Sequence, residues 1–240
     1  MGLSSSSIIH FTASKDSLKG ILKNNFKIKY CTETIEIAGK ERAYAAPMVS
    51  FCDIPLSEVK KHIDSYGSYG IGLTKEWAIR QKLNPVIYIE GNSYFSENIL
   101  ELLRSTEKNK EASANALTVY SYIKNYENTL QRKGKDPVPN YRFSDEREWR
   151  YVPQNTDKNE FTLSKEVYED EETKDAYDFM ISDIFLTFEP NDIKYIIIKD
   201  DSEIREFFSF LRDVKGKYSS HDVDRLTTRI LTTEQIKEDF

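Results

Sequence analysis

The chain has 240 residues, a length that can bury a full hydrophobic core. Of these residues 39% are hydrophobic and 12% are aromatic, and this aromatic content argues against a disordered chain. A net charge of −6 argues against a surface that binds nucleic acid throughout, and no apolar run approaches the roughly 20 residues of a membrane-spanning helix. Two cysteines are too few for a disulfide framework, which favours a reducing compartment. Together with the lack of a membrane-spanning run, this predicts a soluble, reduced, cytoplasmic protein without membrane contact.

The first third of the chain is predicted to alternate short strands and helices. Residues 7–12 (SIIHFT) are an apolar, β-branched run typical of a strand, and Ser14 can cap a helix after it. The apolar face of that helix would hold Leu18, Ile21, Leu22 and Phe26. The next predicted elements are a strand over residues 47–54, a short helix over 57–65, a glycine-rich strand over 66–73, a helix capped by Thr74 and a buried strand over 85–90.

Residues 96–133 contain neither proline nor glycine and follow a helical pattern that the polar residues 107–115 divide into two helices. The remaining predicted elements are a loop over 134–140, strands over 148–152, 183–188 and 195–199, a solvated acidic stretch over 166–178, a helix over 202–213, and a strand plus a helix over 229–240. There is no βαβ repeat and no linker. We expect one α+β domain over residues 1–240, with a split mixed or antiparallel sheet and a helical insertion at about 96–133.

Several common catalytic designs are missing from the sequence. It holds no GxxxxGK[ST] phosphate loop and no GxSxG nucleophile turn. The three histidines are far apart and lie near no HExxH or CxxC motif, so we expect no metal site.

His10 and Thr12 lie two residues apart in a predicted strand, so their side chains would point to the same face. There, the histidine can hydrogen-bond a ribose hydroxyl and the threonine a neighbouring amide or hydroxyl. The alternative is a core histidine whose ring nitrogens are satisfied by backbone groups, as is common in proteins.

Glu146 and Glu148 form a second pair with the same spacing. Paired carboxylates suit chemistry at an anomeric carbon, where one stabilises a developing oxocarbenium ion and the other orients a nucleophile. The alternative is a strand end at which neighbouring arginines neutralise the glutamates. Tyr66 and Tyr69 lie on a glycine-rich turn and can stack on a flat ring, although such tyrosines also occur in ordinary packed turns.

The separated blocks HFT, PMVSFCDIPLS, YGSYGIGLTKEW, NPVIYIE and DEREWRYVP occur in an order that resembles the AbiGi-type abortive-infection (phage-resistance) family of bacteria, over about residues 8–152. The C-terminal RILTTEQIKEDF is also similar. The resemblance implies an antitoxin of a two-gene system, whose partner toxin resembles nucleotidyltransferases.

A more distant resemblance concerns the opening His-x-Thr strand and the helix after it, which are similar to the start of DarT-like ADP-ribosyltransferases. It implies an ADP-ribosyltransferase-like fold that binds NAD as a substrate, with His10 and Thr12 against the nicotinamide side. On this resemblance Tyr66 or Tyr69 would stack on the nicotinamide ring and Arg42 would contact the NAD phosphates. Glu148 would be the catalytic glutamate, completed by Glu146.

Two hypotheses follow. In the first, the chain is an NAD-dependent ADP-ribosyltransferase of phage defence that modifies a nucleic-acid or protein acceptor. In the second, it is a non-catalytic antitoxin or regulator that binds a partner toxin or nucleic acid. Its acidic residues 166–178 would then cover a basic face of the toxin, and the basic residues 132–135, with Arg142, would be the segment that could contact phosphates.

Overall fold

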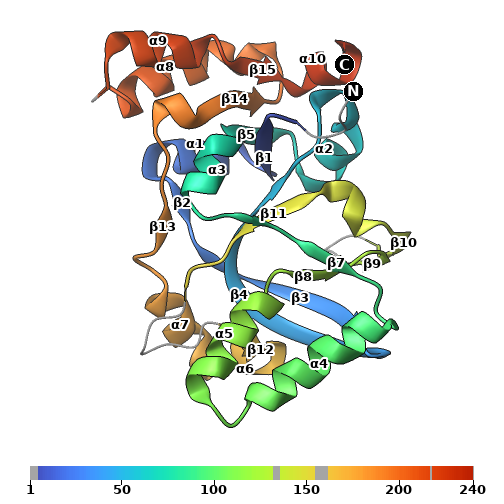
Figure 1. The fold of residues 1–240 in the computed structure, drawn as a ribbon. Coiled ribbons are helices and arrows are strands. Elements are labelled where there is room, and N and C mark those ends of the chain that lie inside the picture. Colours follow the sequence, from blue (N-terminus) through green and yellow to red (C-terminus); the bar gives the residue numbers. More distant parts are fainter. Residues whose placement is uncertain (1–4, 132–135, 155–161, 217, 240) are drawn as a thin grey trace. The chain divides into compact units, whose positions relative to one another are not determined.

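The computed structural model describes residues 5–131, 136–154, 162–216 and 218–239 (Figure 1). The chain forms two compact units. Unit 1 holds residues 1–27, 50–83 and 185–240, and unit 2 holds residues 28–49 and 84–184. The chain therefore passes between the units after residues 27, 49, 83 and 184. The expectation of one domain over residues 1–240 stays a prediction.

Unit 1 is built on a mixed sheet with the strand order β15-β14-β5-β1. The end of β4 pairs with β1 in this sheet, with Cys52 opposite Ile9. β1 and β5 are antiparallel, as are β5 and β14, whereas β14 and β15 are parallel. The strands are β1 (Ser7–Thr12), β4 (Lys40–Cys52), β5 (Tyr69–Thr74), β14 (Ile193–Ile198) and β15 (Ile230–Thr232). This mixed sheet and the helices around it confirm the predicted α+β class.

Two helices of unit 1, α1 and α3, begin at the predicted caps Ser14 and Thr74. The backbone N–H of Ser17 donates to the Ser14 hydroxyl, and that of Trp77 to the Thr74 hydroxyl, each at 3.2 Å. The helices are α1 (Lys15–Asn24), α2 (Lys60–Tyr66), α3 (Lys75–Arg80), α8 (Ile204–Val214), α9 (Ser220–Thr227) and α10 (Thr233–Asp239).

Phe26 does not continue the first helix, contrary to the prediction. The helix ends at Asn24, because Asn25 leaves the helical region with a φ of 68° and a ψ of −177°. Phe26 instead lies in the short strand β2 (Phe26–Lys27), which pairs with β13 (Phe185–Leu186). It is still buried, so the apolar pattern located a core residue but not its element.

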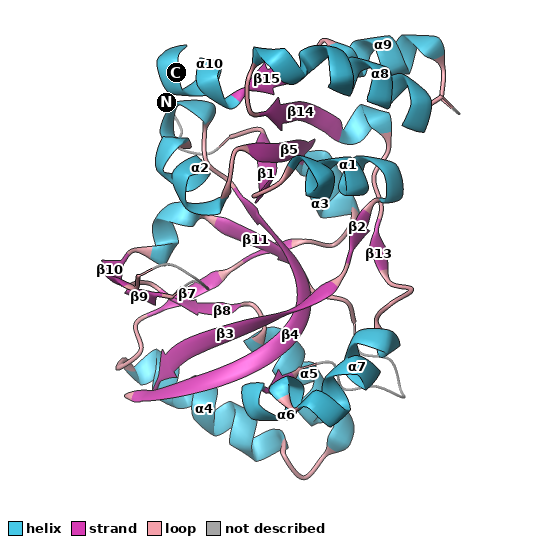
Figure 2. Cartoon of the chain, turned by 180° about the vertical axis from the view of Figure 1, so that it is seen from behind, coloured by secondary structure: helices cyan, strands magenta, loops and turns pink. Residues whose placement is uncertain are grey.

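Unit 2 is dominated by a long antiparallel hairpin of β3 (Lys29–Ile37) and β4, shown in Figure 2. Ile37 pairs with Lys40, so Ala38 and Gly39 form a two-residue turn with φ of 51° and 68°. Two positive φ angles define the type I′ turn, whose twist suits a hairpin. The strand predicted over residues 47–54 is therefore only the end of β4.

The predicted helical insertion is confirmed in its first part and wrong in its last. α4 (Tyr94–Thr106) and α5 (Lys110–Tyr120) are divided at Asn109, whose side chain accepts from Ala112 N at 3.0 Å. Residues 121–131 are not helical. They form the strands β8 (Ile123–Asn125) and β9 (Asn128–Leu130). β8 pairs in parallel with β7 (Ile87–Ile89). The pairing buries Ile123 completely, and this tertiary contact outweighs the local helical pattern.

The rest of unit 2 consists of short elements. Residues 132–135, which include the predicted basic segment, lie outside the described residues, and residues 138–140 of the predicted loop belong to a strand instead. The elements are β6 (Asn84–Pro85), β10 (Val138–Tyr141), β11 (Glu148–Tyr151), β12 (Leu163–Ser164), α6 (Lys165–Glu169) and α7 (Glu171–Met180). In the described part of the chain, every helix is too short or too polar to cross a membrane.

Candidate functional site

The predicted site residues fall into two groups. His10, Thr12, Tyr66 and Tyr69 belong to unit 1, while Arg42, Glu146 and Glu148 belong to unit 2. Within unit 2, Glu146 and Glu148 are brought together around one lysine, whereas Arg42 lines a pocket.

His10 lies in β1 with its ring among aromatic side chains. Its Nδ1 is 2.8 Å from the carbonyl oxygen of Ser50, and the ring meets those of Phe26 and Phe51 edge-on. Because a carbonyl only accepts, Nδ1 carries the proton. Burial lowers the pKa of His10, and the bond to Ser50 offsets this only in part, so the ring is held neutral. These contacts account for Nδ1 and for the packing of the half-buried ring within the protein. A role in NAD binding stays a prediction.

The two tyrosines near the glycine-rich turn are engaged within the protein. Tyr66 stacks on His62 with ring centroids 4.1 Å apart, and the Tyr69 hydroxyl donates to Glu203 at 2.9 Å. Gly67 between them has a φ of 126°, and a Cβ there would be 2.4 Å from the carbonyl oxygen of Thr12. This glycine therefore allows close approach of β1 backbone, a packing role that also suits its unusual φ.

Glu148 begins β11 and forms a bidentate ion pair with Arg150, which lies two residues along the same face. Arg150 Nε donates to one Glu148 oxygen at 2.6 Å and Nη2 to the other at 3.2 Å. The guanidinium also donates to Glu33 at 2.9 Å, to the Ser121 carbonyl at 2.8 Å and to the Tyr44 hydroxyl at 3.3 Å. Glu33 and Tyr44 are register partners in the hairpin, so Arg150 fastens β11 to both of its strands.

Lys124, from β8, is the second cation of this network. Its Nζ lies 2.8 Å from Glu148 and 3.3 Å from Glu146, and 4.6 Å from the centre of the Phe143 ring. Glu146 also accepts from the Tyr141 hydroxyl at 2.9 Å. Three carboxylates therefore surround two cations, and each charged group has an opposite charge within ion-pair distance.

The electrostatics keep the network charged although it is buried. Burial alone would raise the pKa of Glu148, but the charges of Arg150 and then Lys124 outweigh it and hold that pKa well below the ordinary value. Burial likewise would lower the pKa of Lys124, but Glu148, Glu33 and Glu146 raise it. Glu148 is 5% exposed and Arg150 fully buried. A carboxylate whose oxygens both accept from cations is poorly placed to bind a ribose hydroxyl or to take a proton.

Sequence reasoning found Glu146 and Glu148 but missed Glu33 and Lys124. The Glu148-x-Arg150 spacing on a strand was the available signal, since it places opposite charges on one face. Glu33 and Lys124 join from β3 and β8, which were not predicted as strands, so nothing local pointed to them.

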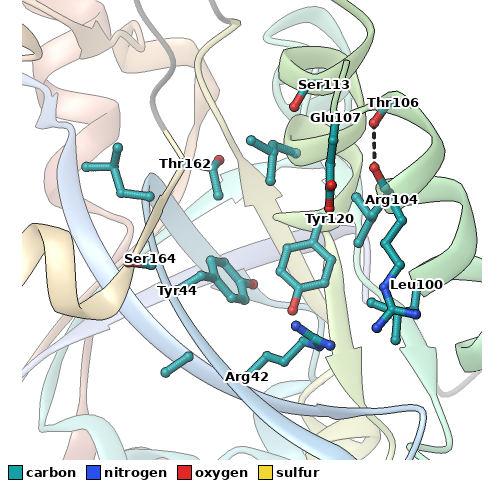
Figure 3. A pocket seen from close by; sticks show the side chains of 14 residues that line it. Arg42, Tyr44, Leu100, Arg104, Thr106, Glu107, Ser113, Tyr120, Thr162 and Ser164 are labelled. Atoms are coloured by element: carbon teal, nitrogen blue, oxygen red, sulfur yellow. Dashed lines mark hydrogen bonds between the residues drawn. The ribbon is translucent and has the colours of Figure 1, made fainter. Parts of the chain in front are cut away.

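A pocket of about 370 Å³ lies in unit 2 close to this network, and Tyr44 belongs to both (Figure 3). Its walls come from β4, α4, α5 and the segment around β12. Arg42 and Tyr44 enter from β4, Arg104 and Glu107 from α4 and its end, and Tyr120 from α5. Among the residues that the structure describes, no group of histidine, cysteine, aspartate or glutamate side chains could hold a metal ion.

Comparisons with known proteins identify relatives of this chain. A sequence model of the family described as “Putative abortive phage resistance protein AbiGi, antitoxin” matches residues 24–199. A protein of Lactococcus lactis subsp. cremoris named “Abortive phage resistance protein AbiGi” is 28% identical over 249 residues, which cover 90% of this chain and 99% of that relative. No solved structure matches significantly.

Proposed function

Because the chain belongs to the AbiGi family of abortive phage resistance proteins, which is described as an antitoxin family, we propose that it is a non-catalytic antitoxin that restrains a partner toxin by binding it. The network around Glu148 carries this proposal. The NAD-dependent transferase hypothesis needs Glu148 as a free carboxylate, whereas both of its oxygens accept from Arg150 and one also contacts Lys124. Freeing it would leave two buried cations without their closest counter-charge, a state that costs several kcal/mol.

The binding surface that we propose is formed by α6 and α7. Residues 166–178 include seven acidic side chains, at positions 166, 169, 170, 171, 172, 175 and 178. Six of these are exposed, and only Asp178 is half-buried. Phe179 at the end of α7 is 79% exposed and adds an apolar contact. An acidic surface with one large aromatic side chain suits a basic partner face, since aromatic residues contribute strongly at interfaces.

A binding titration with the toxin of the same two-gene system tests this proposal. The triple variant Glu171→Gln, Glu172→Gln, Asp175→Asn removes three exposed charges from α7. The matched control neutralises three exposed glutamates on α4 and α5 of the same unit: Glu97→Gln, Glu101→Gln and Glu111→Gln.

We expect a stable complex with the wild type, an affinity that falls at least about tenfold in the α7 variant, and a weaker dependence of that affinity on salt. The control should bind as the wild type does. Absence of a complex would contradict the antitoxin role. Equal weakening by both variants would place the interface elsewhere.

The transferase hypothesis is tested on the same preparation with labelled NAD, with and without nucleic acid and lysate as acceptors. Nicotinamide release or label transfer that Glu148→Gln abolishes would favour the enzyme. We expect neither reaction, because the network leaves Glu148 no free oxygen for the ribose.

A further inference from the structure

The guanidinium of Arg42 is half-buried and lacks a counter-charge among the described residues. Its Nε is buried and has no hydrogen-bond partner there. No described carboxylate lies within ion-pair distance of it, unlike the neighbouring Arg150, which has two. A guanidinium whose Nε is buried without a partner is unusual, because burying an unpaired donor is costly. A ligand with an anionic group would supply the counter-charge and the hydrogen-bond acceptor that the described residues do not offer to Arg42.

Other donors face the same pocket. The Tyr120 hydroxyl makes no hydrogen bond with a described residue, and Arg42 lies close enough to act on its titration. Burial raises the pKa of Tyr120 to about 12 even though the Arg42 charge opposes this, so the hydroxyl keeps its proton at neutral pH. Tyr44 accepts from Arg150, which leaves its own proton free to donate into the pocket.

Arg104 adds a second positive charge from α4, and its exposed side chain forms no ion pair with a described residue (Figure 3). Glu107 is the acidic residue of the lining and is exposed at its rim. Two arginines against one glutamate give the lining a net positive charge in a chain whose own net charge is −6.

We propose that this pocket binds a small phosphate monoester of mononucleotide size, with its phosphoryl group between Arg42 and the Tyr120 hydroxyl. Arginine matches phosphate because its planar fork donates two parallel hydrogen bonds. The body of the ligand packs on the leucine wall formed by Leu100, Leu103 and Leu117. Its polar edge meets Glu107, which can accept from an amino or hydroxyl group.

The pocket volume supports a small ligand. About 370 Å³ lies at the lower end of the roughly 300–1,000 Å³ of small-molecule sites. A dinucleotide such as NAD carries a second nucleotide that this space would not enclose. The proposal does not depend on the antitoxin role, because the α6–α7 surface residues are not part of the lining.

Calorimetric titration of the full chain with AMP, UMP, inorganic phosphate and adenosine tests the proposal. The variant is Arg42→Gln, and the matched control is Arg205→Gln, which removes an exposed arginine of α8 that has no ion pair with a described residue. Since Arg42 has no counter-charge to lose and its buried Nε has no partner, Arg42→Gln should melt at or above the wild-type temperature without ligand.

We expect AMP or UMP to bind at one site, inorganic phosphate to compete, and adenosine not to bind. The affinity should fall at least tenfold in Arg42→Gln and stay unchanged in Arg205→Gln. Equal binding by wild type and Arg42→Gln, or no binding of any phosphate compound by the wild type, would overturn the proposal. Arg42-dependent binding of NAD without binding of AMP or UMP would also overturn it, in favour of a dinucleotide site.

Discussion

Replacing Glu148 with glutamine removes one charge from the centre of the buried network and keeps the size of the side chain. The variant leaves Arg150 and Lys124 without the carboxylate that lies closest to each of them, at 2.6 Å and 2.8 Å. Glu33 still pairs with Arg150 at 2.9 Å, and Glu146 still lies 3.3 Å from Lys124. The perturbation is therefore severe, but neither cation becomes fully isolated.

Removing one partner of a buried ion pair typically costs about 3–5 kcal/mol. Because the two remaining carboxylates compensate in part, we expect a loss near the lower end, about 3 kcal/mol in the free energy of unfolding. For a chain of this size, such a loss lowers the melting temperature by roughly 6–12 °C.

Urea unfolding followed by tryptophan fluorescence measures this loss in each unit. Trp77 is buried in unit 1, and Trp149 lies in β11 of unit 2 between Glu148 and Arg150. Variants that keep one tryptophan each therefore report the two units separately. The matched control is Glu169→Gln, which breaks an exposed pair with Lys165 in unit 2 at 3.9 Å and should cost less than about 1 kcal/mol.

The pH dependence gives a second readout. The pKa of Glu148 is lowered in the folded protein, so its contribution to stability is present above its ordinary value of 4.5 and is lost as pH falls toward the folded value. Glu148→Gln should lack this part of the acid destabilisation. Equal stabilities of wild type, Glu148→Gln and Glu169→Gln would refute the structural role of the network.

Two further predictions concern unit 1. Gly67→Ala should lower the melting temperature strongly, because the new Cβ would lie 2.4 Å from the Thr12 carbonyl oxygen and the backbone there has a φ of 126°. The control is Gly20→Ala in α1, whose Cβ would meet no atom within 4 Å and which should keep or raise stability. If Gly67→Ala melted as the wild type does, the close approach would be wrong. The pKa of His10 is lowered from 6.5 mainly by burial, so stability should fall as pH drops below about 6.5 toward the folded value, and NMR titration should give the His10 ring a pKa below 6.5. A pKa of 6.5 or higher for the His10 ring would contradict this effect of burial.

The sequence located elements whose signals are local. The strand over residues 7–12, the caps at Ser14 and Thr74, and the break before Asn109 all lie within a few residues of their cause. The β3–β4 hairpin was missed although residues 37–40 read IAGK. Its turn uses Ala38 in place of the asparagine or aspartate that normally precedes glycine in a type I′ turn.

Elements that depend on distant partners could not be predicted in the same way. Residues 121–131 have a helical pattern, yet β8 forms because Ile123 is buried against β7, about 35 residues earlier in the chain. The candidate site shows the same limit. Glu148 and Arg150 share a strand face and could be paired from spacing, but Glu33 and Lys124 reach them only through the tertiary fold.

On the proposed function, this chain restrains a toxin and does not consume NAD. Growth of cells that express the partner toxin, alone or with this chain, tests it most directly when cellular NAD is measured in the same cultures. We expect that the chain restores growth, that the α7 charge variant restores it less, and that expressing the chain alone leaves growth and NAD unchanged. A chain that by itself stops growth and depletes NAD, with both effects abolished by Glu148→Gln, would contradict it.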